Sequence, residues 1–251
     1  MKVVVVGGTG LIGSKVVAKL TASGHQAVAA SPRTGVNTLT GDGVDAVLTG
    51  ADVLVDVSNS PSFEEKAVMD FFTVSTGTLL AAEGRAGAGH HVILSVVGAD
   101  RMTDSAYFRA KVAQEKLIEE SGIPYSIVHA TQFFEFVASI ADEATDGDTV
   151  RLAPVSIQPM AAEDAATAVT LAAIAPALGG IHEVGGPQKF RLTELIARSL
   201  AARNDPRTVV ADPEARYFGA LLSDGELTPG PDAELYRTTF DEWLTGNARV
   251  S

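Results

Sequence analysis

Two side chains at helical spacing in this chain could carry out proton chemistry. Tyr107 and Lys111 stand four residues apart in a segment predicted to be helical, so they lie on one face. A lysine ammonium beside a phenol favours the phenolate and lowers the tyrosine pKa from about 10. Such a tyrosine could exchange a proton with a substrate oxygen, and Ser95, at the end of a predicted strand, could hydrogen-bond that oxygen. The alternative is a packed ring and a solvated amine at chance spacing.

A glycine-rich segment near the N-terminus predicts a bound dinucleotide. Four valines, Val3–Val6, lead into Gly-Gly-Thr-Gly-Leu-Ile-Gly, and a helical pattern follows. In this context glycines permit a tight turn, close approach of the backbone to a pyrophosphate, and close packing of helix and strand. The first N–H groups of the helix then face the phosphates. We predict a dinucleotide site, against a turn without a ligand, with contacts at Gly7, Thr9, Gly10, Leu11, Ile12 and Gly13.

The end of the second predicted strand bears on which dinucleotide binds. A cofactor with a free ribose 2′-hydroxyl usually meets a carboxylate there. This chain has Ala-Ala-Ser-Pro-Arg instead, and Arg33 could grip a 2′-phosphate while Ser31 donates a hydrogen bond. The sequence therefore favours NADPH over NADH, although Arg33 could also be a solvated loop residue.

Further cofactor contacts are expected where later strands end. Asp42 follows a third predicted strand and could accept a hydrogen bond from the adenine amino group or shape the Gly-Asp-Gly turn. Ser58, Asn59 and Ser60 follow the fourth. Ligands of open α/β sheets bind in the crevice outside the carboxyl ends of the strands.

Strand-like and helix-like segments alternate through the first half of the chain, which predicts βαβ units in a Rossmann-type, doubly wound parallel sheet of six or seven strands. We expect residues 1–251 to form one domain, with residues 150–251 contributing most of a substrate lid. The expected strands are Val3–Val6, Gln26–Ala30, Val36–Leu39, Val53–Val57, His91–Val96, Tyr125–His129 and His182–Val184, and the longer helices are Leu11–Ala22, Glu64–Gly84, Thr103–Glu120, Ala161–Ala175 and Leu192–Ala202.

The composition of the chain limits the classes of molecule that it can bind. With 31 acidic and 19 basic residues the net charge is −12, which repels nucleic acid phosphates and anionic membranes. There is no cysteine, so disulfides, thiolate nucleophiles and Cys-based metal sites are excluded, and we expect no metal. No secretory signal pattern or membrane-spanning stretch is evident, so a cytoplasmic location is expected. A small-molecule substrate is the expected partner, and the oligomeric state is left open.

The glycine motif, Ser95 and Tyr-Phe-Arg-Ala-Lys at 107–111 together resemble the short-chain dehydrogenase/reductase superfamily. The segments His91–Arg101, Tyr107–Glu115 and Gly122–Phe136 look like its atypical, NmrA-like branch. The resemblance implies that the Thr131–Phe136 loop lies against the nicotinamide and one wall of the substrate pocket. On that basis Thr131 and Phe133 are expected cofactor contacts, beside Lys111. The rings of Phe133 and Phe134 could stack on a flat substrate or belong to the core, and we expect the two to point different ways. Met160 and Phe218 are further expected substrate contacts, from the lid.

The leading interpretation is an NADPH-dependent reductase that transfers hydride to a quinone, carbonyl or conjugated small molecule. One alternative is a redox sensor that binds NADP(H) without turnover. Another is a sugar-nucleotide epimerase-like enzyme, although the C-terminal part shows no cluster of basic residues for a second diphosphate.

Overall fold

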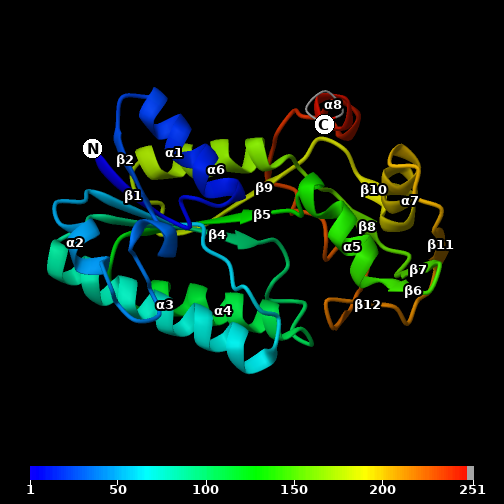
Figure 1. The fold of residues 1–251 in the computed structure, drawn as a ribbon, viewed down its shortest axis with the longest axis horizontal. Helices are drawn as coiled ribbons and strands as arrows, with labels where there is room; N and C mark the ends of the chain where they lie inside the picture. Colours follow the sequence, from blue (N-terminus) through cyan, green and yellow to red (C-terminus); the bar gives the residue numbers. More distant parts are fainter. Residues whose placement is uncertain (248–251) are drawn as a thin grey trace.

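The glycine-rich turn follows a strand of a seven-stranded parallel sheet (Figure 1), in a computed structural model that describes residues 1–247. The strand order is β14-β9-β5-β4-β3-β1-β2. The chain moves from β1 outward to β2, then returns across β1 to β3, so the direction of winding reverses between β1 and β3. This confirms the doubly wound α/β fold. The strands are β1 (Lys2–Val6), β2 (Gln26–Ala30), β3 (Val53–Asp56), β4 (His90–Val96), β5 (Tyr125–Ala130), β9 (Gly180–Gly185) and β14 (Glu234–Leu235).

Both faces of the sheet are covered, which explains the unbroken valine run in β1. Val3 and Val5 pack in the cluster under α1 (Leu11–Ala22) and α6 (Ala162–Ile174). Val4 packs on the opposite face with residues of α2 (Val44–Leu48) and α3 (Glu65–Ala86). Helix α4 (Ala106–Glu119) packs beside α3 on that second face, and Figure 1 shows α1 and α6 above the sheet with α3 and α4 below.

The third expected strand, Val36–Leu39, is wrong. These residues form a loop after a short 3₁₀ helix, η1 (Pro32–Thr34), and β2 is left at the edge of the sheet. The Asn37 backbone N–H donates to Asp42 O at 2.9 Å and its side chain accepts from the Leu39 N–H at 3.0 Å, so the segment folds back on itself. Val36 and Thr38 are buried, whereas Leu39 is 46% exposed, so Val36 is the one apolar side chain of the segment that reaches the core, without a strand.

The second half of the chain completes the sheet and adds a layer beyond its carboxyl edge. It supplies α6, β9 and β14, while α5 (Val137–Glu143) and α7 (Leu192–Ala202) lie past the ends of β4 and β5 (Figure 1). No helix within residues 1–247 is long and apolar enough to cross a membrane. The remaining elements are η2 (Phe134–Phe136), α5 (Val137–Glu143), β6 (Thr145–Asp146), β7 (Thr149–Leu152), β8 (Ser156–Ile157), β10 (Phe190–Arg191), α7 (Leu192–Ala202), β11 (Thr208–Ala211), β12 (Arg216–Tyr217), β13 (Ala220–Leu221) and α8 (Phe240–Asn247).

The added layer has its own apolar cluster, and Phe134 lies inside it. The Phe134 ring is 1% exposed and its centroid lies 5.3 Å from that of Phe240 and 5.7 Å from that of Trp243. Of the two alternatives for Phe134, a substrate wall or the core, the structure places the ring in the core. The aromatic ring joins η2 to α8 instead.

Replacing Phe134 by alanine is expected to lower the free energy of unfolding by about 3–5 kcal/mol, because a buried ring is lost and a cavity is left. Urea unfolding measures the change. The matched variant Phe136→Ala removes a ring that is 45% exposed and should cost less than about 1 kcal/mol. Equal losses in the two variants would contradict this assignment of Phe134 to the core.

Candidate functional site

The glycine-rich turn is packed so closely that side chains are excluded from it. A Cβ on Gly7, which has φ +75°, would lie 2.9 Å from Ser58 Cα, and one on Gly8 would lie 2.6 Å from Val5 O. A Cβ on Gly13 would lie 2.2 Å from Gly7 O. The turn thus brings the end of β1, the start of α1 and the end of β3 into backbone contact. This is the point where the winding of the sheet reverses, which is where open α/β sheets bind ligands.

The mouth of the turn presents backbone rather than side chains. Gly10 is the N-cap of α1 and offers no capping side chain, so the N–H groups of the first turn lack acceptors within the helix. Thr9, Gly10 and Leu11 are exposed, whereas Ile12 and Gly13 are buried. The side chain of Ile12 packs in the core under α1, which leaves its backbone as the only part available to a ligand.

Three hydroxyl groups along the same edge of the sheet lack hydrogen-bond partners. Ser31, Ser58 and Thr131 follow the ends of β2, β3 and β5, and the side-chain oxygen of each is buried with no partner among residues 1–247. Buried polar groups in folded proteins are nearly always paired. The glycine-rich turn, Gly7–Gly13, which we call the glycine cradle, lies at the same sheet edge as these three unpaired hydroxyls. The arrangement therefore fits a long polar ligand that lies across the strand ends, such as a dinucleotide.

The residue expected to grip a 2′-phosphate is positioned beside the first of these hydroxyls. Arg33 lies in η1, two residues after Ser31, and its side chain is exposed. Among the described residues it takes part in no ion pair, so its guanidinium is available to a ligand.

Asp42, Asn59 and Ser60 use their side chains within their own loops. The Asp42 carboxylate accepts from Thr40 Oγ1 at 2.7 Å, which agrees with a turn-shaping role, and the strand expected before it is absent. Asn59 is exposed, and its side-chain oxygen accepts from the Ser60 N–H at 3.0 Å. Ser60 Oγ donates to Ser62 O at 2.8 Å.

Lys111 reaches into the protein rather than into the open crevice. Its side chain is nearly fully buried, and Nζ donates to Leu94 O at 3.0 Å and to the side-chain oxygen of Gln114. The amine also lies 4.6 Å from the centroid of the Phe72 ring. Burial lowers the pKa of Lys111 to about 8, although the nearby carboxylates of Asp56 and Glu115 act in the opposite direction.

Tyr107 is not activated in the way that its spacing from Lys111 suggests. Its ring packs against Phe63, Phe72 and Phe108, with centroids 5.5, 5.9 and 5.4 Å away. Burial raises the pKa of Tyr107 to about 12. The expected lowering of this pKa is wrong, because the Lys111 ammonium bonds to the end of β4 instead of resting beside the phenol.

A buried polar network that sequence reasoning missed surrounds Lys111. The Ser95 hydroxyl donates to the Glu115 carboxylate, and His129 Nε2 lies 3.0 Å from Glu115 Oε1. Burial raises the pKa of Glu115, but the contacts with His129, Ser95 and Lys111 outweigh it and hold the pKa below its usual value. In this arrangement the Ser95 hydroxyl is directed to α4 rather than to a substrate.

The network continues to the strand beside the glycine turn. Gln114 Nε2 donates to Asp56 Oδ2 at 3.1 Å, and Asp56 Oδ1 accepts from the Ser58 N–H at 2.9 Å. Gln114 and Glu115 follow Lys111 by three and four residues, and Asp56 and His129 lie near the ends of strands. Helical spacing and strand-end position were therefore signals that could have found them.

Tyr107 lines an open cavity of about 630 Å³ beyond the sheet edge. Phe63, from the loop after β3, and Phe218, between β12 and β13, form aromatic walls, and their rings are 5.6 Å apart. The rest of the lining comes from the start of α4 and the residues just before it, from α5, and from the turn between β12 and β13: Asp104, Ser105, Ala106, Ser139, Asp142, Glu143 and Gly219. Of the expected site residues, the structure thus brings Tyr107 and Phe218 together, and it adds Phe63.

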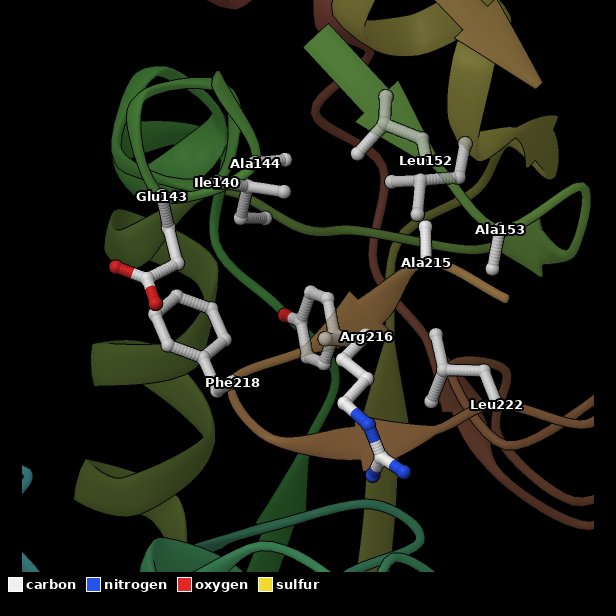
Figure 2. Close-up of a pocket in the computed structure, with 11 residues that line it drawn as sticks. Ile140, Glu143, Ala144, Leu152, Ala153, Ala215, Arg216, Phe218 and Leu222 are labelled. Carbon is white, nitrogen blue, oxygen red and sulfur yellow. The ribbon is translucent and has the colours of Figure 1, made fainter. Parts of the chain in front are cut away.

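A second cavity, of about 10 Å³, is lined in part by Phe218 and has room for about one water molecule (Figure 2). Glu143 and Phe218 line both cavities. The narrow cavity is otherwise walled mainly by apolar side chains such as Ile140, Leu152 and Leu222, and Arg216 points away from them in Figure 2. We therefore place the candidate substrate site in the larger cavity.

The expected site residues of the loop after β5, and Met160 beside it, pack into two different apolar clusters. Phe133 is half-buried and packs under α6, with its ring centroid 5.8 Å from that of Phe136. Met160 is fully buried, pairs with Phe133 through the backbone, and lines neither cavity of the described residues, so its contact with substrate stays a prediction. Phe133 and Phe134 point into different clusters.

Comparison with known proteins identifies solved structures that have the same fold. No protein-family model matches the chain, and no curated protein sequence is similar to it. Solved structures do match over its whole length. MoeE5 in complex with UDP-glucose and NAD is 16% identical, with a TM-score of 0.75, and the match covers 100% of this chain and 99% of that one.

Two further structures match equally completely. UDP-glucose 4-epimerase from Thermotoga maritima with UDP-glucose is 15% identical, with a TM-score of 0.73 and 100% of both chains covered. A dTDP-4-dehydrorhamnose reductase from Clostridium acetobutylicum is 15% identical, with a TM-score of 0.70, covering 100% of this chain and 99% of that one. At these identities the likeness establishes the fold, in agreement with the strand order above.

The buried amine makes stability depend on pH in a specific direction. Because the folded state holds the pKa of Lys111 near 8 and the unfolded chain restores about 10.5, the unfolded state binds more protons between these values. Burial of the ammonium thus costs most below pH 8, and stability is recovered as the pH rises towards 10.5. The free energy of unfolding of the wild type, relative to Lys111→Met, should rise by about 2 kcal/mol between pH 7.5 and 9.5. Urea unfolding of both proteins checks this. A difference that does not change with pH would contradict the buried position of the amine.

Proposed function

We propose that this chain is an NAD(P)H-dependent oxidoreductase of the short-chain dehydrogenase/reductase superfamily, in its atypical, NmrA-like branch. It transfers a hydride to a quinone, carbonyl or conjugated small molecule held in the larger cavity. The glycine cradle with its three unpaired hydroxyls is the observation that carries this proposal. The fold shared with MoeE5, described in complex with NAD, supports it.

Different groups around the glycine cradle bind different parts of the cofactor. The N–H groups of the first turn of α1 bind the pyrophosphate, with the positive end of the helix dipole behind them. Ser58 and Thr131 donate hydrogen bonds from the neighbouring strand ends. The bound nicotinamide supplies the hydride, while the protein supplies orientation.

Tyr107 acts as a neutral hydrogen-bond donor on the wall of the cavity. With its pKa at about 12, the phenol keeps its proton at neutral pH and can donate a hydrogen bond to a substrate oxygen. It is a poor proton donor, and a quinone acceptor suits such a site because the hydroquinone oxygens can take protons from water. Lys111, bonded to Leu94 O, holds the end of β4 and the start of α4 in place.

NADPH is the proposed form of the cofactor. Ser31 and Arg33 lie at the end of β2, where a 2′-phosphate would sit, and no carboxylate follows the strand directly. A guanidinium can form paired hydrogen bonds with phosphate oxygens, and hydrogen bonds to charged groups contribute about 1.5–3 kcal/mol.

Arg33→Ala is expected to weaken NADPH binding about tenfold or more and to change NADH binding less than about twofold, because only NADPH carries the 2′-phosphate. Titration of cofactor fluorescence measures both affinities. The control Arg203→Ala removes an exposed arginine in the C-terminal half and should alter neither. A wild type that binds NADH as tightly as NADPH would overturn the proposed preference.

An epimerase acting on a sugar nucleotide is the second candidate, because the T. maritima structure shares the fold over the whole chain. The cavity weighs against it. Its lining within residues 1–247 includes three carboxylates and no lysine, arginine or histidine, whereas a sugar nucleotide brings a diphosphate.

Turnover separates the candidates. The purified protein is expected to oxidise NADPH, followed at 340 nm, with at least one member of a panel of quinones and conjugated carbonyls, and not to convert UDP-glucose to its 4-epimer. Epimerisation with NAD and no net oxidation of cofactor would favour the second candidate. Tight NADP(H) binding without turnover of any acceptor would instead indicate a redox sensor.

A further inference from the structure

The larger cavity has the chemistry of a site for a positively charged ring compound. Three of its walls are aromatic: Phe63, Tyr107 and Phe218. Phe63 is 57% exposed and its ring is stacked on Phe218 with an interplanar angle of 28°, so a broad aromatic surface faces open space. A flat conjugated compound can stack on such a surface, and a cation is further attracted to the faces of the rings.

The rim of the cavity is acidic. Asp104, Asp142 and Glu143 line it, and arginines outside the lining partly balance two of them: Arg216 lies 3.7 Å from Asp104, and Arg207 lies 2.9 Å from Asp142. Arg207 also forms an ion pair with Asp205, and Arg109 forms one with Glu65. Neither arginine therefore adds an unpaired positive charge to the rim. Glu143 has no ion-pair partner within residues 1–247.

A buried hydroxyl at the cavity points independently to a ligand. Ser105 is 1% exposed, lines the cavity, and its hydroxyl has no hydrogen-bond partner among the described residues. It stands at the N-cap of α4, one residue before Ala106, but makes no capping hydrogen bond. An unpaired hydroxyl in an otherwise packed helix start is the kind of group that a bound molecule satisfies.

Among residues 1–247, the cavity has no ready proton donor. Tyr107 holds its proton tightly, Lys111 and Ser95 are turned into the buried network, and the carboxylates of the rim are exposed to solvent. Reduction of a simple ketone needs a proton at the oxygen. An acceptor that carries its own positive charge does not.

We propose that the cavity binds a planar, cationic iminium compound and that this is the substrate class of the reductase. This inference rests on the proposed function. One hydride adds to the iminium carbon, the π electrons of the C=N bond move onto nitrogen, and nitrogen loses its positive charge. NADPH is oxidised to NADP⁺, the iminium is reduced to an amine, and no proton is consumed.

Binding is tested first, without cofactor, on the wild-type chain. The probes are N-methyl-3,4-dihydroisoquinolinium, its neutral ring analogue 1-tetralone, and the anionic UDP-glucose. Isothermal titration should give affinity for the iminium about tenfold higher than for tetralone, and UDP-glucose should not compete with the iminium. Equal affinity for the iminium and the ketone, or displacement of the iminium by UDP-glucose, would overturn the proposal.

A charge-removing variant connects the affinity to the rim. Glu143→Gln keeps the shape of an exposed side chain and should weaken iminium binding about two- to fivefold while leaving tetralone binding unchanged, as expected for one partly solvated charge pair. Glu119→Gln removes an exposed charge elsewhere on the surface, in α4, and should change neither affinity. If Glu143→Gln and Glu119→Gln behave alike, the rim does not select the cation.

Turnover with NADPH then separates failure of this inference from failure of the proposed function. Oxidation of NADPH by the iminium at a higher kcat/KM than by tetralone supports both. Oxidation by quinones or tetralone but not by the iminium overturns the inference alone. Absence of NADPH binding to the wild type overturns the proposed function, while the cofactor-free titration still decides what the cavity binds.

Discussion

The backbone contact between the glycine turn and the end of β3 is the constraint on which the rest of the structure depends. Gly7, Gly8 and Gly13 have no room for a Cβ, and the atoms that exclude it belong to β1, β2, the residues just after β3 and the turn itself. The contact fixes α1 at the point where the winding reverses and leaves its first N–H groups facing outward. Every other part of the candidate site is arranged around that edge, including the unpaired hydroxyls and the cavity beyond them.

A second constraint is the burial of charge beneath the cavity. Lys111, Glu115 and Asp56 lie inside the protein, and each is held by hydrogen bonds to neighbouring strands and α4. Leaving one buried charge without its partner is strongly destabilising, so such a network specifies one arrangement of α4 against β3, β4 and β5. The network gives Tyr107 a fixed place on the cavity wall. It also explains why Lys111, which is spaced four residues from Tyr107, stabilises the fold as well as contributing to the site.

Sequence patterns predicted the sheet well because β-branched runs such as Val3–Val6 have few alternatives between glycine turns and helical segments. They failed at Val36–Leu39, where alternating apolar and polar residues are also compatible with a loop that buries Val36 and Thr38. Four-residue spacing placed Tyr107 and Lys111 on one helix face, but it could not show that the long lysine side chain reaches Leu94 O. Phe63 stands alone in a polar loop and gives no periodic signal, so only the folded chain shows that it faces Phe218.

Hydrogen–deuterium exchange at the glycine turn, with and without saturating NADPH, tests the central claim most directly. If the backbone of this turn holds the pyrophosphate, amide exchange across Gly8–Ile12 slows when NADPH is added, and the segment after β2 that contains Ser31 slows with it. Binding of NADPH that leaves exchange at Gly8–Ile12 unchanged would contradict the account, because the cofactor would then lie elsewhere on the protein.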